Sequence, residues 1–339
     1  MTAFAAVATN LLEIQDLQTH FFTPRGVARV LDGLNLRLEA GSIVGLVGET
    51  GSGKSVTGFS ILRLVRNPGR IVGGEIRFDG RNLLALPEGE MVALRGRSIA
   101  MIFQNPRSAL NPLQSVGRFL EQVLAYRVGI SKKDLRAEAI KLLRAVHMPD
   151  PERRLEGFPH QISGGMAQRV MIAAAIASRP KLLIADEPTT GLDVTVQAQI
   201  VRLLRELRDQ TGSAQLLITH DLGLASEVCD SIAVMYAGEI VEFAPTRELF
   251  TNPQHPYTQG LLASRPKLGQ TGTIPVIAGN VPNLIDPPSG CRFHPRCPQA
   301  LERCRHQRPL PTVLSAKHSA SCFLLDAAAA PVQVEGRHA

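Results

Sequence analysis

The stretch SIVGLVGETGSGKSVTGFSILRLV constrains the fold more than any other part of the sequence. It begins with an apolar run, Ile43 to Val47, that has the length of a buried strand. A glycine-rich turn then leads directly into a segment with helical periodicity. A strand joined to a helix by so short a turn is typical of an α/β fold with a parallel sheet.

The turn has the spacing of the phosphate-binding P-loop, Gly48-x-x-x-x-Gly53-Lys54-Ser55. Its glycines let backbone N–H groups face the phosphates, and the helix N-terminus adds partial positive charge. Lys54 would reach the β- and γ-phosphates of ATP, and Ser55 would bind Mg²⁺. The segment therefore predicts a nucleotide site formed by Gly48, Glu49, Thr50, Gly51, Ser52, Gly53, Lys54, Ser55 and Val56.

Two further apolar runs end in residues that suit this chemistry. The segment KLLIADEP predicts a strand from Leu182 to Ala185 that delivers Asp186 and Glu187 to its carboxyl end, where parallel sheets bind ligands. One of these carboxylates can hold Mg²⁺ through its water shell, and the other can polarise an attacking water. The run from Leu216 to Thr219 is followed by His220, and its position leaves open either a contact with the γ-phosphate or a structural role.

Composition limits the class of protein. The 339 residues are 44 % hydrophobic and 20 % charged, as in a soluble globular protein with a main domain and an appendage. The formal charge of +7 comes without the long basic clusters that indicate nucleic-acid binding. The chain shows neither a secretory signal nor an apolar stretch of eighteen residues, which predicts a protein that works inside the cell without spanning the membrane.

Four of the five cysteines lie in the last fifty residues, separated by five, six and seventeen residues. Inside a cell, disulfides are rare, so this cluster indicates metal or redox chemistry. The residues alone leave open an iron–sulfur cluster, a Zn²⁺ ion or free thiols, although zinc sites usually contain closer pairs. Cys229 lies in an apolar helical context and is expected to be a small buried residue. The candidate ligands are Cys291, Cys297, Cys304 and Cys322.

The segment ISGGMAQRVMIAAAIASRP identifies a family. Ser163-Gly164-Gly165-Met166, followed by Gln168 and Arg169, resembles the signature motif of ATP-binding cassette (ABC) ATPases. The other motifs occur in the order of that family. They are the P-loop, Gln104 in FQNP, the signature, Asp186-Glu187, Asp193 in TGLD, and His220.

The resemblance implies that two such domains enclose two ATP molecules head to tail. The signature residues and Asp193 would then contact the nucleotide of the partner domain. Glu187 would be the general base, His220 a ligand of the γ-phosphate, and Gln104 a Mg²⁺ and coupling ligand beside Ser55 and Asp186. An aromatic residue upstream of the P-loop would stack on adenine, and Phe21 is assigned to it, with Phe22 as the alternative.

The tail narrows the family. HPYTQGLL and GCxFxPRCPxAxxxC resemble the C-terminal region of dipeptide/oligopeptide-importer ATPases, and Met166 is frequent in that branch. The resemblance implies a [4Fe–4S] cluster on the four cysteines, with Zn²⁺ as the alternative. It also implies two membrane permeases, a second homologous ABC ATPase in a heterodimer and a substrate-binding protein, with no nucleic acid as partner. The chain would lie peripherally on the cytoplasmic face of the inner membrane.

The expected fold is an α/β P-loop NTPase of ABC type, with a parallel-sheet core, an antiparallel β subdomain, a helical subdomain and a small Cys-rich C-terminal extension. Its expected limits are residues 1–250 for the ATPase domain, about 105–165 for the helical subdomain, 251–323 for the extension and 324–339 for a disordered tail. The predicted function is ATP hydrolysis that drives uptake of di- or oligopeptides. The alternatives are a soluble ABC ATPase acting on DNA or ribosomes, and a non-catalytic nucleotide-binding regulator.

Overall fold

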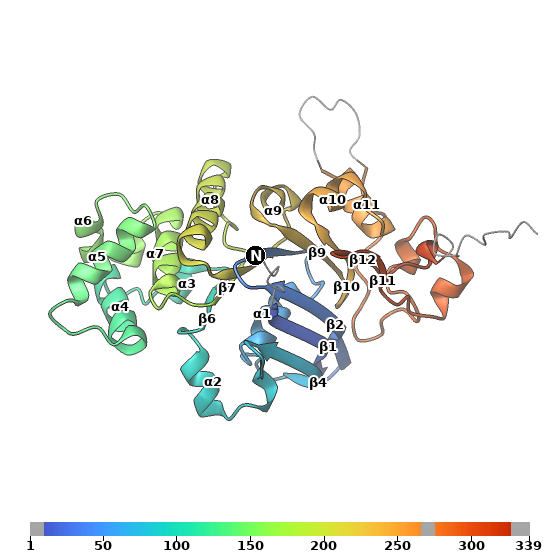
Figure 1. Cartoon of the computed structure of the whole chain (residues 1–339), viewed down its shortest axis with the longest axis horizontal. Coiled ribbons are helices and arrows are strands. Elements are labelled where there is room, and N and C mark those ends of the chain that lie inside the picture. Colours follow the sequence, from blue (N-terminus) through green and yellow to red (C-terminus); the bar gives the residue numbers. More distant parts are fainter. Residues whose placement is uncertain (1–9, 266–274, 327–339) are drawn as a thin grey trace, which may run out of the picture.

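The protein, described here by a computed structural model, contains two β-sheets with helices around them (Figure 1). The model describes residues 10–265 and 275–326. The smaller sheet is antiparallel throughout, as the sequence predicted for one subdomain. Its order is β2-β1-β4-β5, with β1 at Asn10–Thr23, β2 at Gly26–Glu39, β4 at Gly69–Phe78 and β5 at Arg81–Asn82.

The larger sheet has eight strands in the order β11-β12-β10-β9-β3-β8-β7-β6. The five strands from β9 to β6 are parallel neighbours, which confirms the predicted parallel core. These are β3 (Ile43–Val47), β6 (Ile99–Ile102), β7 (Leu182–Asp186), β8 (Ala214–Thr219) and β9 (Ser231–Tyr236).

The other three strands make the sheet mixed. A two-residue turn, Ala237 and Gly238, reverses the chain into β10 (Glu239–Pro245) because both residues have positive φ, as a tight hairpin requires. The strands β11 (Thr312–Ser315) and β12 (His318–Ala320) then add to this antiparallel edge. The C-terminal region is therefore joined to the main sheet, where the sequence had suggested a separate appendage.

The parallel strands are buried on both faces. Along β3, Val44 and Leu46 face the small sheet, whereas Ile43 and Val47 face the opposite helices. The first face carries α1 (Lys54–Ile61), a 3₁₀ turn at Leu83–Ala85 and α2 (Glu88–Leu94). The second face carries α7 (Gly164–Ile176), α8 (Val194–Thr211) and α9 (Leu222–Val228).

Between β6 and α7 the chain forms a helical region, drawn in green in Figure 1. It contains α3 (Pro106–Ala109), α4 (Val116–Val123), a π-helical turn at Leu124–Val128, α5 (Leu135–Ala145), α6 (Pro151–Glu156) and a 3₁₀ turn at Pro159–Gln161. Ala139 and Leu143 of α5 are buried, so this helix packs one apolar face against the core. None of the described helices has both the length and the apolarity needed to cross a membrane.

After β10 come two helices, α10 (Thr246–Thr251) and α11 (Pro256–Ala263). Three 3₁₀ turns follow, at His294–Arg296, Glu302–Arg305 and Phe323–Leu325. Leu325 is buried, so the folded region extends past residue 324, where the sequence analysis placed the start of a disordered tail. The rest of that predicted tail, residues 327–339, lies outside the described residues.

Candidate functional site

The glycine-rich loop lies at the carboxyl end of β3, in the middle of the large sheet. Gly48 stands against the carbonyl oxygen of Met235 on β9, and a side chain at position 48 would collide with it. Gly53 has φ 106° and begins α1, a conformation that favours glycine. The loop therefore turns tightly enough to direct its N–H groups and the N-terminus of α1 to one side of the sheet edge.

Lys54 holds the two ends of this loop together. Its ammonium group donates to the carbonyl oxygens of Gly48 and Glu49, at 2.8 and 2.9 Å. Burial lowers the pKa of Lys54, while the nearby carboxylates of Glu187 and Asp186 act in the opposite direction. The cation is thus placed beside the loop and is partly withdrawn from water, as a phosphate ligand needs to be.

Ser55 and Asp186 meet at the end of the loop. The Ser55 hydroxyl donates to Asp186 Oδ1 at 2.9 Å, although the two residues are 131 positions apart. Burial raises the pKa of Asp186, and the hydrogen bond from Ser55 lowers it only in part. A hydroxyl and a carboxylate oxygen side by side are suitable ligands for Mg²⁺ or its bound waters.

Glu187 collects three polar partners from three different segments. Thr190 Oγ1 donates to Glu187 Oε2 at 2.7 Å, Gln104 Nε2 lies 3.4 Å from the same oxygen, and His220 Nδ1 lies 3.1 Å from Oε1. Burial raises the pKa of Glu187, but the hydrogen bonds from Thr190 and His220 outweigh it, so the pKa lies below its usual value. The side chain is only 12 % exposed, against 58 % for His220.

The ends of three strands beside the P-loop bring the other predicted residues into one place. Gln104 follows β6, Asp186 and Glu187 end β7, and His220 follows β8, each at the carboxyl end of its strand. The arrangement can bind a phosphate chain, hold Mg²⁺ and polarise a water molecule beside the terminal phosphate. Sequence reasoning missed Thr190, which lies in the segment TTGLD and whose only signal was its distance of three residues from Glu187.

The remaining residues of the predicted loop differ in burial. Thr50 and Gly51 are exposed at its tip, Ser52 is buried, and Val56 packs against the core below α1. Phe21 lies on β1, opposite Ala28 of β2 and Gly69 of β4. It is partly buried, whereas Phe22 is 43 % exposed and carries the guanidinium of Arg70 over its ring.

The signature residues form a second location. Ser163 begins α7, and its hydroxyl accepts a hydrogen bond from the N–H of Met166 at 3.3 Å. Asp193 begins α8 in the same way and accepts from the N–H of Val196 at 3.0 Å. Gly164 and Gly165 complete the first turn of α7, and Gly165 lies against Val196. In Figure 1, α7 lies well apart from α1, so one chain does not bring this motif to its own P-loop.

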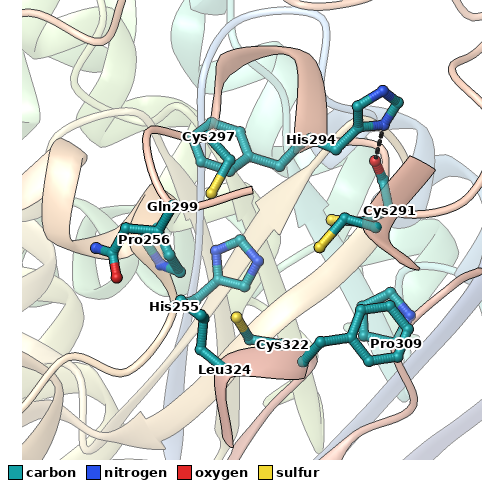
Figure 2. Close-up of a pocket in the computed structure, with 12 residues that line it drawn as sticks. His255, Pro256, Cys291, His294, Cys297, Gln299, Pro309, Cys322 and Leu324 are labelled. Atoms are coloured by element: carbon teal, nitrogen blue, oxygen red, sulfur yellow. Dashed lines mark hydrogen bonds between the residues drawn. The ribbon is translucent and has the colours of Figure 1, made fainter. Parts of the chain in front are cut away.

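The four C-terminal cysteines line one small enclosed pocket, with His255, Phe293 and Phe323 beside them. Figure 2 shows Cys291, Cys297 and Cys322 directed into this space. Burial raises the pKa of Cys291 to about 12 and also raises that of Cys297 and Cys322. The free volume is only ≈ 10 Å³, and among the described residues no three or more His, Cys, Asp or Glu side chains are placed to hold a metal ion. Cys229, outside the pocket, is buried as predicted.

Comparison with known proteins identifies the family. Residues 31–190 match the family described as ABC transporter, and residues 241–304 match the oligopeptide/dipeptide transporter C-terminal region. The oligopeptide transport ATP-binding protein OppD of Salmonella typhimurium is 49 % identical over 304 residues, which cover 89 % of this chain and 90 % of OppD. The dipeptide transport ATP-binding protein DppD of Escherichia coli is 45 % identical over 95 % of this chain and 99 % of DppD.

The chain belongs to the ABC transporter ATP-binding protein family. A probable peptide ABC transporter ATP-binding protein, y4tR of Sinorhizobium fredii, is 48 % identical over 93 % of this chain and 95 % of its own length. The solved dimer of MJ0796, a bacterial ABC transporter cassette, superimposes with a TM-score of 0.63 at 27 % identity. It covers 70 % of this ABC ATPase and 99 % of MJ0796. A second MJ0796 structure, a post-hydrolysis state bound to ADP and phosphate, has a TM-score of 0.62.

These matches show an ABC-type ATPase. They confirm the predicted recognition of the oligopeptide/dipeptide branch, the cassette fold and the class of enzyme. The assignments of individual site residues and the metal on the four cysteines remain predictions.

Proposed function

We propose that this ABC ATPase energises the uptake of di- or oligopeptides as the ATP-hydrolysing subunit of a membrane importer. The observation that carries the proposal is the complete polar cluster around Glu187, which lies beside a loop able to hold ATP. The names of the relatives OppD and DppD give the cargo class. Nothing in the chain favours the alternative of a soluble ATPase acting on DNA or ribosomes.

In the proposed mechanism, residues 48–56 bind the phosphates of ATP, and Ser55, Asp186 and Gln104 hold Mg²⁺. Glu187 accepts a proton from the attacking water, and its lowered pKa keeps it ionised at neutral pH. His220 contacts the γ-phosphate. The exposure of His220 supports this role, because the ring can reach a bound nucleotide without any change in the strands.

A second ATPase would supply the missing half of each site. The signature residues, Met166 included, and Asp193 would contact the nucleotide of the partner, in a heterodimer with a homologous chain. The distance between α7 and α1 supports this, because the N-terminus of α7 is free to bind a phosphate of another subunit (Figure 1). ATP binding would close the dimer, and hydrolysis would reopen it.

The helical region, residues 105–165 of an ATPase domain spanning 1–250, would dock on two membrane permeases at the cytoplasmic face of the inner membrane. Arg107 of α3 supports a coupling role, because it donates to the carbonyl oxygen of Ile162 at 3.2 Å, next to the signature. A movement of the segment after Gln104 would therefore reach Ser163 directly. A substrate-binding protein outside the membrane would deliver the peptide.

The four cysteines of the region 251–323 would hold a [4Fe–4S] cluster with a structural role. Their convergence on one enclosed, largely apolar pocket supports this, because such a pocket excludes the water that attacks clusters. The small free volume requires the walls to move outward, since even one water needs about 10–15 Å³. Bound iron would also keep the thiols deprotonated against the effect of burial.

The transport proposal is tested by purifying the tagged protein from detergent-solubilised native membranes and identifying the co-eluting chains by mass. We expect two permeases and a second ATPase. Recovery only with ribosomes or nucleic acid would contradict the proposal and favour the soluble alternative.

The cluster proposal is tested by measuring iron, zinc and acid-labile sulfide in protein purified without oxygen. We expect about four irons and four sulfides per chain. The variant Cys304→Ser should lose them, whereas Cys229→Ser, a matched change outside the pocket, should keep them. Stoichiometric zinc without sulfide would replace the cluster by a zinc ion.

A further inference from the structure

Two side chains of the C-terminal region contact Glu49, the second residue of the P-loop. Arg296 donates to the Glu49 carboxylate twice, from Nη1 to Oε2 at 2.7 Å and from Nη2 to Oε1 at 3.0 Å. The hydroxyl of Tyr257 on α11 accepts a hydrogen bond from the Glu49 N–H at 3.0 Å. The P-loop is thus held on its outer side by residues that lie more than 200 positions later in the chain.

Contacts other than those with Glu49 also hold the Arg296 guanidinium in place. Its Nε donates to the carbonyl oxygen of Ala278 at 2.8 Å, and it lies over the ring of Tyr236. Its side chain is only 7 % exposed, against 27 % for Glu49. The hydrogen bonds with Glu49 raise the pKa of Arg296 against the effect of burial, so this residue stays charged. A rigid two-point pair of this kind orients its partner as well as neutralising it.

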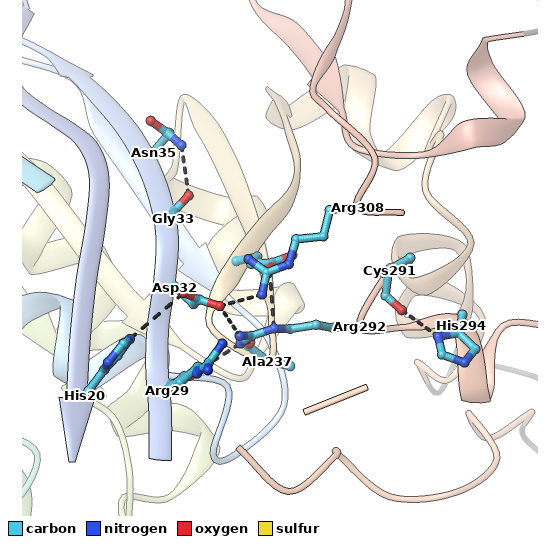
Figure 3. A network of polar contacts seen from close by, with 11 residues as sticks. His20, Arg29, Asp32, Gly33, Asn35, Ala237, Cys291, Arg292, His294 and Arg308 are labelled. Atoms are coloured by element: carbon cyan, nitrogen blue, oxygen red, sulfur yellow. Dashed lines mark hydrogen bonds and ion pairs between the residues drawn. The ribbon is translucent and has the colours of Figure 1, made fainter. Parts of the chain in front are cut away.

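A second connection reaches the other end of the loop. Arg292 donates to the carbonyl oxygen of Ala237, and the next residue, Gly238, donates its N–H to the carbonyl oxygen of Ser52 at 2.8 Å. Figure 3 shows Arg292 between Ala237 and Asp32, with Arg308 beside them. The C-terminal region therefore supports both Glu49 and, through the β9–β10 turn, Ser52.

Both contacting residues adjoin the cysteine pocket. Arg296 directly precedes Cys297. Tyr257 lies two residues after His255, and the Nδ1 of His255 accepts a hydrogen bond from the Tyr257 N–H at 3.0 Å. Phe293 of the pocket packs against both Tyr236 and Tyr257. The packing of the pocket therefore sets where Arg296 and Tyr257 lie.

From these contacts we infer that Arg296 and Tyr257 are positioning residues for the P-loop, and that the C-terminal region thereby sets the affinity of this ATPase for ATP. The inference rests on the nucleotide site proposed above. A free carboxylate at position 49 would repel the phosphates that the loop is built to hold, and Arg296 cancels that charge. The Tyr257 hydroxyl accepts the hydrogen bond of the Glu49 N–H, and this contact fixes the direction of the next backbone N–H groups of the P-loop.

The test is equilibrium binding of a fluorescent ATP analogue with Mg²⁺ to the full chain. Arg296→Gln should raise the Kd about tenfold, the effect of losing a well-ordered charged pair. Arg305→Gln is the matched control, because Arg305 lies in the same region, is 65 % exposed and, among the described residues, forms its ion pair with the exposed Glu302. Tyr257→Phe should raise the Kd about threefold, since one buried N–H loses its acceptor.

Second-site rescue separates positioning from general stability. In Glu49→Gln no charge remains to be neutralised, so adding Arg296→Gln should raise the Kd less than about threefold. In the assembled transporter, Arg296→Gln should raise the KM for ATP about tenfold and change kcat less than about twofold. Arg296→Lys, which keeps the charge, should recover part of the affinity.

A Kd for Arg296→Gln equal to that of Arg305→Gln would overturn the inference, even if the melting temperature fell. The variant Lys54→Ala separates a failure of the positioning role from a failure of the proposed nucleotide site. If Lys54→Ala abolishes binding while Arg296→Gln binds normally, only the positioning role fails. If Lys54→Ala binds ATP as the wild type does, the proposed nucleotide site fails and this inference with it.

Discussion

The carboxyl edge of the large sheet and the cysteine pocket differ in how far their polar groups are already paired and how much free space they contain. At the sheet edge, Lys54, Ser55 and Glu187 already have hydrogen-bond partners at 2.7–3.1 Å. In the pocket, burial raises the pKa values of the Cys291, Cys297 and Cys322 thiols, and the free volume is ≈ 10 Å³.

The difference follows from the dielectric surroundings. A polar, half-open edge can keep charges fixed at little cost, because each is paired and partly hydrated, and a preorganised edge binds and reacts without rearrangement. An apolar pocket disfavours thiolates unless a cation offsets their charge, and here Phe293 and Phe323 line the pocket beside the thiols. Changes at the edge should therefore affect turnover, and changes near the pocket should affect stability and affinity.

The largest effect is expected at the edge. Glu187→Gln keeps the size of the side chain and an acceptor for Thr190 but removes the base. It should lower kcat about 10²–10⁴-fold and leave the Kd for ATP within a factor of about two. Steady-state phosphate release and ATP binding measure the two quantities. Glu302→Gln, at an exposed position in the C-terminal region, is the control. Wild-type turnover in Glu187→Gln would exclude Glu187 as the base.

The second largest effect is expected for a substitution of Arg292, which lies between the two regions. This guanidinium is 1 % exposed and pairs with Asp32 and Glu239 (Figure 3). Arg292→Met would leave Glu239 with the more exposed Arg308, and Asp32 with Arg308 and a long contact to His20. We expect a loss of about 3 kcal/mol in the free energy of unfolding, at the lower end for breaking a buried pair.

Urea unfolding followed by far-ultraviolet circular dichroism measures this loss, with Arg305→Met as the control. A loss below about 1 kcal/mol would mean that the network behaves as a surface pair. The C-terminal region would then be held mainly by β12 and the aromatic contacts.

The sequence predicts the sheet edge well and the C-terminal region poorly, for a physical reason. The strands at Ile43–Val47, Leu182–Asp186 and Ala214–Thr219 are short apolar runs. Glu187 and His220 directly follow the last two, and Lys54 follows the first after the glycine-rich turn. The apolar runs and the positions of the residues that follow them therefore locate Lys54, Glu187 and His220 without any knowledge of distant contacts.

The contacts of the C-terminal region have no local signal. The pairs Arg296–Glu49 and Arg292–Asp32 join residues 247 and 260 positions apart, and the pairing of β12 with β10 depends on how the chain returns to the sheet. Local competition between side chains adds to this. The Ser131 hydroxyl donates to Asp134 rather than capping a helix, and α5 begins at Leu135.

The third prediction concerns pH and the Asp32 pair. Burial raises the pKa of Asp32, but the hydrogen bond from Arg308 and the charge of Arg292 outweigh it, so its pKa lies below the ordinary value of 3.8. The stability that Asp32 contributes is therefore present above pH 3.8 and is lost as the pH falls through the lowered value.

Asp32→Asn should cost about 2 kcal/mol near neutral pH, the size of a hydrogen bond to a charged group. The difference between wild type and variant should be constant from pH 8 to pH 5 and shrink below about pH 4, because the wild type then loses the same charge. Urea unfolding across this range measures it. A constant difference down to pH 3 would show that the charge of Asp32 is not what stabilises the region.

The smallest effect is expected at Phe21, the residue predicted to stack on adenine. Thr19 Oγ1 lies 3.0 Å from Ser60 Oγ on α1, and Phe21, two residues further along β1, shares that face of the strand. Phe22 points to the other face, under Arg70.

Phe21→Leu keeps the apolar volume but removes the aromatic face, so it should raise the Kd for ATP about fivefold. Stacking on a base is worth about 1–3 kcal/mol, and leucine recovers part of it. Phe22→Leu is the matched control and should bind ATP as the wild type does. The reverse result would assign the adenine contact to Phe22 and would mean that β1 turns its other face toward the nucleotide when ATP binds.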